Sequence, residues 1–266
     1  MKTVWVLGAG FTGQAVVSEL VRRGDRVLAT SRTAEGAAAL TALGAEGVVW
    51  QAPDPLADIH ADAAIVLFPP RGLDPALVAA CLAAVPRLVY CSSTSVYGNQ
   101  GGEEVTEETP TAPESPWSVA RVEAEDALRI VGAMIVRAAG IYGPGRNILE
   151  RHAAGQLRHA GDPERPVNLI HVDDLAGLLI ACVDQGRPGQ VYLGATGRPV
   201  PWSALAEVAV QRVGRPLPAY ETVPQDPNVA MFSRESKRCF PTRFAELGFA
   251  LRYPDTLAVL RELPIP

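Results

Sequence analysis

The sequence lacks several features that mark particular classes of protein. Its four cysteines are widely spaced and form no zinc-type pair, which favours buried reduced thiols over disulfides or a metal site. Acidic residues outnumber basic ones by 29 to 24 and the two signs are interspersed, which argues against a nucleic-acid partner. No apolar run approaches the roughly 18 residues of a membrane span. We expect a soluble, cytoplasmic protein.

The sequence does contain an alternation of short apolar runs with amphipathic segments. Gly24 is a suitable end for the first helix because glycine readily adopts the C-cap conformation. The pattern predicts strands over residues 4–7, 26–30, 47–50, 63–68 and 87–92, and helices over residues 11–23, 34–43 and 75–84. Strands that alternate with helices form a parallel sheet with helices on both faces. We therefore predict an α/β, Rossmann-type doubly wound fold.

The second half of the chain is less regular. A polar loop over residues 98–116 precedes the later elements. We expect helices over residues 118–131, 147–159, 173–183 and 202–213, strands over 133–136 and 190–193, and a C-terminal pair of helices. We interpret residues 1–145, with 166–195 returning to them, as a dinucleotide-binding domain. Residues 146–165 and 196–266 then form a small, discontinuous subdomain that covers the substrate.

A glycine loop joins the first strand to the first helix. It reads Gly8-Ala9-Gly10-Phe11-Thr12-Gly13. In this setting the first glycine allows a tight turn, the second admits a pyrophosphate, and the third lets helix and strand pack closely. The helix N-terminus offers unpaired N–H groups and a partial positive charge to the phosphates. The loop, including Phe11 and Thr12, is therefore a candidate dinucleotide site.

The end of the second strand indicates which dinucleotide is bound. An NAD site usually has an acidic residue there to bind the ribose 2′-hydroxyl, whereas this strand ends in Ser31 and Arg32. These side chains suit the 2′-phosphate of NADP(H), although an exposed loop arginine is the simpler alternative. We predict NADP(H), with NAD as a possible second cofactor. We also predict cofactor contacts from Phe68, Pro69, Ser92 and Gly140.

Three further motifs extend the pattern along the chain: Cys-Ser-Ser-Thr-Ser-Val-Tyr-Gly at 91–98, Arg-Ala-Ala-Gly-Ile-Tyr-Gly-Pro-Gly-Arg at 137–146, and Ile-His-Val-Asp-Asp-Leu-Ala at 170–176. With the glycine loop, they resemble the short-chain dehydrogenase/reductase superfamily, specifically its extended, NAD-dependent epimerase/dehydratase-like branch. The resemblance implies that Ser93 hydrogen-bonds the substrate oxygen. It also implies a Tyr-x-x-x-Lys pair on the next helix.

This chain departs from that pair. Alignment of residues 115–125 places Trp117 at the tyrosine position and Arg121 at the lysine position. An indole N–H is only a hydrogen-bond donor, so it cannot replace a phenol as acid and base. The pattern is similar to the atypical YeeZ-like proteins, whose members lack the tyrosine. Tyr97 and Tyr142 are alternative proton donors, but tyrosines at strand ends are more often packing residues.

Three histidines can each be interpreted as a functional or as a structural residue. His171 precedes Asp173 and Asp174, which favours a strand-end histidine followed by a helix N-cap made by an aspartate, rather than a metal site. His152 and His159 would share one face of the helix over residues 147–159, as a solvated basic surface or as an anionic-substrate site. We predict no metal.

We expect an NADP(H)-dependent oxidoreductase acting on a small carbonyl or hydroxyl substrate. Two alternatives stay open: a non-catalytic dinucleotide-binding or redox-sensing protein, and a nucleotide-sugar epimerase or dehydratase. Either a monomer or a homodimer fits the sequence.

Overall fold

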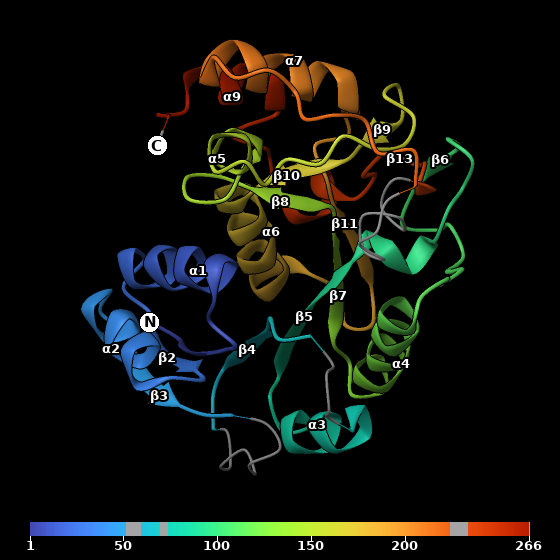
Figure 1. Cartoon of the computed structure of the whole chain (residues 1–266). Coiled ribbons are helices and arrows are strands. Elements are labelled where there is room, and N and C mark those ends of the chain that lie inside the picture. The colour runs from blue at the N-terminus through green and yellow to red at the C-terminus, as the bar shows by residue number, and fades with distance from the viewer. Residues whose placement is uncertain (52–59, 70–73, 224–233, 266) are drawn as a thin grey trace.

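The centre of the molecule is a seven-stranded parallel sheet with the order β11-β7-β5-β4-β1-β2-β3 (Figure 1). The computed structural model describes residues 1–51, 60–69, 74–223 and 234–265. The strands are β1 (Thr3–Leu7), β2 (Arg26–Ser31), β3 (Glu46–Val49), β4 (Ala63–Val66), β5 (Arg87–Ser93), β7 (Met134–Ala138) and β11 (Val191–Gly194). The strand order reverses between β1 and β4, and doubly wound sheets bind ligands at such a point. The predicted Rossmann-type fold is confirmed.

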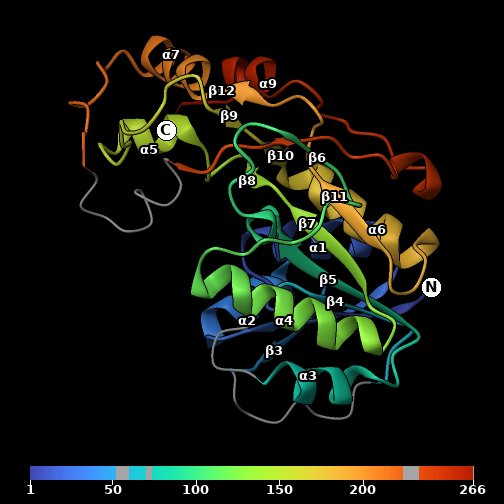
Figure 2. The same cartoon turned by 90° about the vertical axis from the view of Figure 1, so that its right-hand side faces the viewer.

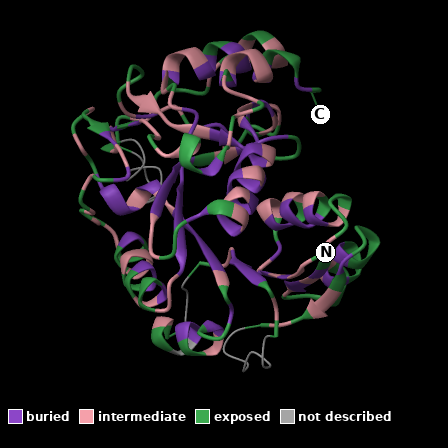
Figure 3. Cartoon of the chain, turned by 180° about the vertical axis from the view of Figure 1, so that it is seen from behind, coloured by how far each residue is buried: buried purple, intermediate pink, exposed green. Residues whose placement is uncertain are grey.

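Helices cover both faces of the sheet. They are α1 (Phe11–Arg22), α2 (Ala34–Ala42), α3 (Pro75–Leu82), α4 (Pro116–Ile130) and α6 (Val172–Gln185). Side chains alternate along a strand, so Val89 and Cys91 of β5 pack with α1 and α6, while Leu88 and Tyr90 pack with α3 and α4. Figure 2 shows α3 and α4 in front of the sheet and α1 behind it. Strands β4, β7 and β11 are accordingly buried along their whole length (Figure 3).

A smaller layer lies over the carboxyl ends of the strands (Figure 1). Its elements are β8 (Gly140–Tyr142), α5 (Ile148–Ala153), β9 (Pro166–Val167), β10 (Leu169–His171), β12 (Val200–Pro201), α7 (Trp202–Val213) and α9 (Thr256–Glu262). Leu149, Leu205, Val208 and Leu260 belong to a hydrophobic cluster of this layer, separate from the two clusters on the sheet. Among the residues that the structure describes, no helix is both long and apolar enough to cross a membrane.

The C-terminal segment is tied back to the loop that follows β5. This loop begins with the 3-10 helix η1 (Thr94–Tyr97) and contains a short strand, β6 (Glu104–Val105). The strand pairs in parallel with β13 (Arg238–Cys239), and a second 3-10 helix, η2 (Phe244–Leu247), follows. Of the expected pair of C-terminal helices, the described residues contain one α-helix, α9, and the 3-10 helix η2.

The helix predicted over residues 147–159 is much shorter. It ends before Gly155, which has a φ of +69° and turns the chain away from the helical path. His152 is buried and hydrogen-bonds a backbone carbonyl oxygen 2.8 Å away, and His159 stacks on an aromatic ring. The expectation that these histidines share one helix face was wrong. The helical pattern of the sequence continues past Gly155, whereas the helix itself ends before this residue.

Candidate functional site

The three glycines of the first loop have three different environments. Gly8 has a φ of +82°, and a Cβ there would lie 2.9 Å from the Cβ of Phe68. A Cβ on Gly13 would lie 2.8 Å from the Cβ of Ala9, so this glycine permits close packing of α1 on the loop. A Cβ on Gly10 would meet nothing within 4 Å. The open space at Gly10, beside the N-terminus of α1, fits a pyrophosphate.

The loop is fixed to the end of β2. The Gly8 N–H donates to the Thr30 hydroxyl, and the Ala9 N–H donates to the Thr30 carbonyl, each over 2.8 Å. Ser31 ends the strand half-buried, and Arg32 follows it fully at the surface. Within the described part of the chain, no carboxylate forms an ion pair with Arg32. The guanidinium is therefore free to bind an anion, and its contact with a 2′-phosphate stays a prediction.

A cavity of about 610 Å³ lies between the carboxyl ends of the strands and the smaller layer. The predicted site residues that line it are Thr12, Ser92, Ser93, Arg121 and Gly140. They come from α1, β5, α4 and the start of β8, so the fold brings together motifs that are far apart in sequence. Because the cavity begins at Thr12 in the first turn of α1, it continues from the glycine loop.

The serine pair at the end of β5 provides hydroxyl groups to this cavity. The Ser93 Oγ accepts a hydrogen bond from the Ser95 N–H over 3.1 Å, and its own hydrogen remains available for donation. Ser92 is only 3% exposed, and its Oγ has no hydrogen-bond partner among the described residues. A buried hydroxyl without a partner is costly. Both serines are thus suited to bind a polar group of a ligand.

Arg121 and Trp117 occupy different surroundings although they lie one turn apart on α4. Arg121 lines the cavity with Ser93. Burial raises the pKa of the nearby Cys91 thiol to about 11, and the positive charge of Arg121 partly opposes this rise. Trp117 is 47% exposed and does not belong to the described lining of the cavity. If the alignment with the family pattern holds, the tyrosine position offers no acid here, whereas Arg121 offers a cation at the cavity.

The two candidate tyrosines lie outside this lining. The Tyr97 hydroxyl donates to the Thr106 carbonyl oxygen over 2.9 Å, and burial raises the pKa of Tyr97 to about 12. Tyr142 packs edge-on against His171, with ring centroids 5.3 Å apart, and burial raises its pKa too. A proton donor near neutral pH needs a lower pKa and access to the substrate. The structure does not bring either tyrosine to Ser93.

The histidine beside the aspartate pair stabilises the start of α6. The Asp173 N–H donates to His171 Nδ1 over 3.2 Å, so the histidine itself is the N-cap that we had assigned to an aspartate. Asp174 accepts the backbone N–H groups of Arg252 and Tyr253. Over the described ranges, no three His, Cys, Asp or Glu side chains gather as a metal site would require.

Several residues of the cavity wall were not predicted from the sequence. They are Leu67, Arg146, Arg151, Arg165, Asn168, Glu235 and Lys237, among others. Arg165 lies in no motif, and although Arg146 ends the motif at 137–146, its place on the cavity wall depends on how the smaller layer folds over the sheet. Lys237 did carry one: it is one of two lysines in the chain.

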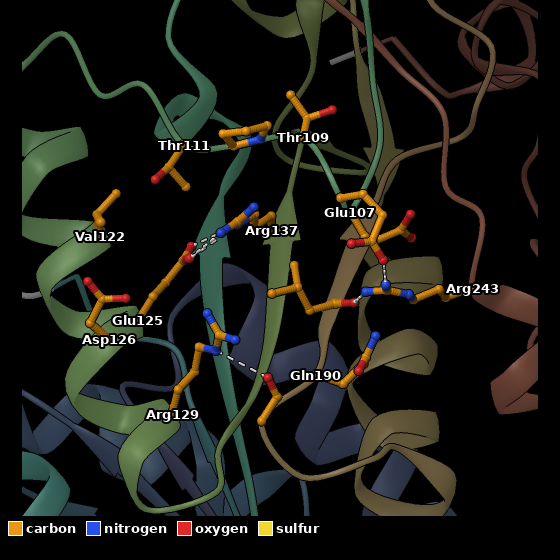
Figure 4. Close-up of a pocket in the computed structure, with 14 residues that line it drawn as sticks. Glu107, Thr109, Thr111, Val122, Glu125, Asp126, Arg129, Arg137, Gln190 and Arg243 are labelled. Carbon is orange, nitrogen blue, oxygen red and sulfur yellow. Dashed lines mark hydrogen bonds and ion pairs between the residues drawn. The ribbon is translucent and has the colours of Figure 1, made fainter.

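A second cavity, of about 560 Å³, lies beside α4 and β11 (Figure 4). Arg137 and Glu125 form a buried ion pair there, 2.7 Å apart. Glu107 accepts hydrogen bonds from the N–H groups of Leu193 and Thr242. These charged groups are satisfied by the protein itself, and none of the predicted cofactor or catalytic residues lines this cavity.

Comparisons with known proteins agree with this geometry. A model of the "NAD dependent epimerase/dehydratase family" matches residues 71–194, and one described as "NADP oxidoreductase coenzyme F420-dependent" matches residues 3–89. Protein YeeZ of Escherichia coli (strain K12) is 30% identical, and the match covers 97% of this chain and 99% of YeeZ. The 2-alkyl-3-oxoalkanoate reductase of Stenotrophomonas maltophilia is 27% identical over 81% of this chain and 77% of its own.

Solved structures show the same relationship. A functionally unknown conserved protein from Silicibacter pomeroyi DSS is 32% identical, with a TM-score of 0.85 over 98% of this chain and 97% of its own. Human epimerase family protein SDR39U1, in a structure with NADPH, shares the fold at 22% identity, with a TM-score of 0.73 over 98% of both chains. These comparisons show that the chain belongs to the atypical, NAD-dependent epimerase/dehydratase-like short-chain dehydrogenases/reductases.

Proposed function

We propose that the protein is an NADP(H)-dependent oxidoreductase that acts on a small carbonyl or hydroxyl substrate. The observation that carries this proposal is the continuity of the site. The open glycine loop, the unpaired Arg32 beside it and the cavity at Ser93 lie along one edge of the sheet. Reductases among the relatives, and NADPH in the SDR39U1 structure, support the same class of reaction.

The protein binds the cofactor through the backbone of the glycine loop and through the positive charge of an arginine side chain. Gly10 leaves room for the pyrophosphate at the N-terminus of α1, and Arg32 with Ser31 binds the 2′-phosphate. Bound NADPH supplies a hydride to the substrate. Because the loop is held to β2 through Thr30, these groups are positioned before the cofactor arrives.

The protein polarises the substrate through groups at the end of β5 and on α4. Ser93 donates its hydroxyl hydrogen to the substrate oxygen, which gains negative charge as the carbonyl is reduced. Arg121 adds positive charge on the same cavity wall. The smaller layer covers this site and reduces its contact with water, which strengthens both interactions.

The test is consumption of NADPH with a panel of small aldehydes and ketones. We expect turnover of at least one compound, and a loss of about 100-fold in kcat/KM for Ser93→Ala, the usual effect of removing one donor to a developing oxyanion. Ser203→Ala is the matched control, since that hydroxyl bonds Glu164 at the surface outside the cavity. Equal activity of Ser93→Ala and wild type contradicts the proposed site.

One observation favours a second candidate, a non-catalytic dinucleotide-binding protein. Trp117 stands at the tyrosine position and is half exposed, outside the cavity lining. Tight NADPH binding without turnover of any compound in the panel would support this candidate. Inversion or dehydration of a nucleotide sugar would support the epimerase or dehydratase alternative.

A further inference from the structure

Lysine is almost absent from this chain, and one of its two lysines lies at the cavity. Of the 24 basic residues, 22 are arginines and only Lys2 and Lys237 are lysines. The Lys2 side chain is 42% exposed and pairs with Asp184, as surface lysines commonly do. The Lys237 side chain is 5% exposed and lines the cavity that contains Ser93. A buried lysine in an arginine-rich chain points to a property that arginine lacks.

The ammonium group of Lys237 has two partners in the structure. Its Nζ donates to the Gly98 carbonyl oxygen over 3.0 Å and to the Glu235 carboxylate over 2.8 Å. An ammonium group has three N–H donors, so one remains for a ligand in the cavity. Glu235 also lines the cavity, and its side chain is 18% exposed. Because it is partly exposed, Glu235 can exchange protons with water.

The backbone around Lys237 is held firmly in place. The Asn168 side chain donates to the Lys237 carbonyl oxygen over 2.8 Å and accepts the Cys239 N–H over 2.7 Å. Pairing of β13 with β6 fixes the next residue, Arg238, opposite Glu104. These contacts fix the side chain against the end of η1, the short helix that Ser93 caps. A group so constrained can meet a substrate oxygen in a defined geometry.

We propose that Lys237 is the catalytic proton donor of this enzyme and that Glu235 relays protons to it from solvent. The inference rests on the proposed oxidoreductase function and supplies the acid that Trp117 cannot. Bound NADPH would supply the hydride, its own C–H bond breaking as it is oxidised to NADP⁺, so the carbonyl carbon gains a C–H bond and the π electrons move to oxygen. That oxygen takes a proton from Nζ, so an N–H bond breaks and an O–H bond forms. The neutral amine then regains a proton through Glu235.

Arginine could not perform this step because its guanidinium does not release a proton in proteins. The proposal thus accounts for a lysine where the chain otherwise uses arginine. It differs from a purely structural role, in which Lys237 only holds the C-terminal segment against Gly98. In that role an arginine, which keeps the charge and the hydrogen bonds, would be an adequate replacement.

The first test does not require turnover. Protein labelled with ¹⁵N-lysine gives two side-chain nitrogen signals, which Lys2→Arg and Lys237→Arg assign. We expect NADP⁺ to shift the Lys237 signal, because a proton donor for the substrate must lie beside the nicotinamide ring, and to leave the Lys2 signal unchanged. A Lys237 signal that does not respond to saturating NADP⁺ overturns the proposal, whether or not a substrate is known.

The second test compares variants in carbonyl reduction. General acid catalysis contributes about 100- to 10,000-fold, so Lys237→Arg should lose at least 100-fold in kcat while its KM for NADPH stays within about twofold. Glu235→Gln keeps the lysine but should slow its reprotonation, lowering kcat and changing the pH profile. Lys2→Arg is the matched control and should behave as wild type.

The outcomes separate this proposal from the proposed function. Wild-type kcat in Lys237→Arg shows a structural lysine and overturns the proposal while the oxidoreductase function stands. If Lys237→Arg does not fold, Glu235→Gln decides, and an unchanged kcat and pH profile in that variant count against the relay and the donor. If wild type reduces no carbonyl compound, the function fails first, and the NADP⁺ titration alone decides whether Lys237 lies at the reaction site.

Discussion

Replacement of Arg32 by alanine isolates the contact that should distinguish NADPH from NADH. The side chain is exposed at the end of β2, and within the described residues it has no ion-pair partner whose loss would affect the fold. NADH has only a hydroxyl where NADPH carries the 2′-phosphate. The substitution should therefore weaken NADPH binding, leave NADH binding unchanged and leave the free energy of unfolding near that of wild type.

The size of the effect follows from the kind of bond lost. A hydrogen bond to a charged group contributes roughly 1.5–3 kcal/mol, and solvent around an exposed guanidinium favours the lower end. Because about 1.4 kcal/mol corresponds to a factor of ten, we expect the Kd for NADPH to rise about 10-fold. The loss should shrink as salt concentration increases, since both charges are accessible to ions.

Calorimetric titration with both cofactors measures this directly. Arg26→Ala is a matched control because Arg26 begins the strand that Arg32 follows, about 20 Å away at the usual rise per residue, in an exposed ion pair with Glu46. It should leave both affinities unchanged. Equal losses of NADPH and NADH affinity in Arg32→Ala, or no loss of either, would refute the assignment of Arg32 to the 2′-phosphate.

Three further substitutions test other parts of the account. Gly10→Val should keep the wild-type melting temperature, because its Cβ meets open space, but should abolish NADPH binding in a fluorescence titration; normal affinity contradicts the pyrophosphate site. Burial lowers the pKa of His171, so its contribution to stability is complete above about pH 6.5 and is lost as pH falls toward the folded-state pKa. Between pH 7 and pH 5, the free energy of unfolding in urea should fall less in His171→Asn than in wild type. An equal fall in the two proteins contradicts this. Glu125→Gln should cost about 3–5 kcal/mol in the same assay because it leaves Arg137 buried without its partner, and a cost below about 1 kcal/mol contradicts this.

The cofactor end of the site could be predicted because its chemistry is local in sequence. The three glycines, with predicted roles in the tight turn, in pyrophosphate binding and in helix packing, lie within six consecutive residues. The strand before them and the helix after them follow simple apolar periodicities. Gly8 has the left-handed conformation of a turn and Gly13 packs closely, as expected, while the contact of Gly10 with a pyrophosphate stays a prediction. Arg32 follows the adjacent strand, so strand pairing alone brings it to the same edge.

The substrate end could not be predicted in the same way. Glu235 and Lys237 reach the cavity only because β13 pairs with β6, and two-residue strands leave no recognisable pattern. Arg165 lies on the wall because a short antiparallel pair, β9 with β12, folds over the sheet. The apolar periodicity also predicted too long a helix for α5, because it did not take account of Gly155, whose left-handed backbone conformation turns the chain away.

In the proposed reaction, a hydride moves from NADPH to a substrate in the cavity at Ser93. The most direct measurement uses NADPH with deuterium at the carbon that donates hydride. Wild type and Ser93→Ala are incubated with the panel of carbonyl compounds, and the products are analysed by mass spectrometry. The account predicts deuterium on the former carbonyl carbon of at least one product, and far less of it with Ser93→Ala. Tight binding of NADPH with no deuterium in any product would contradict the claim.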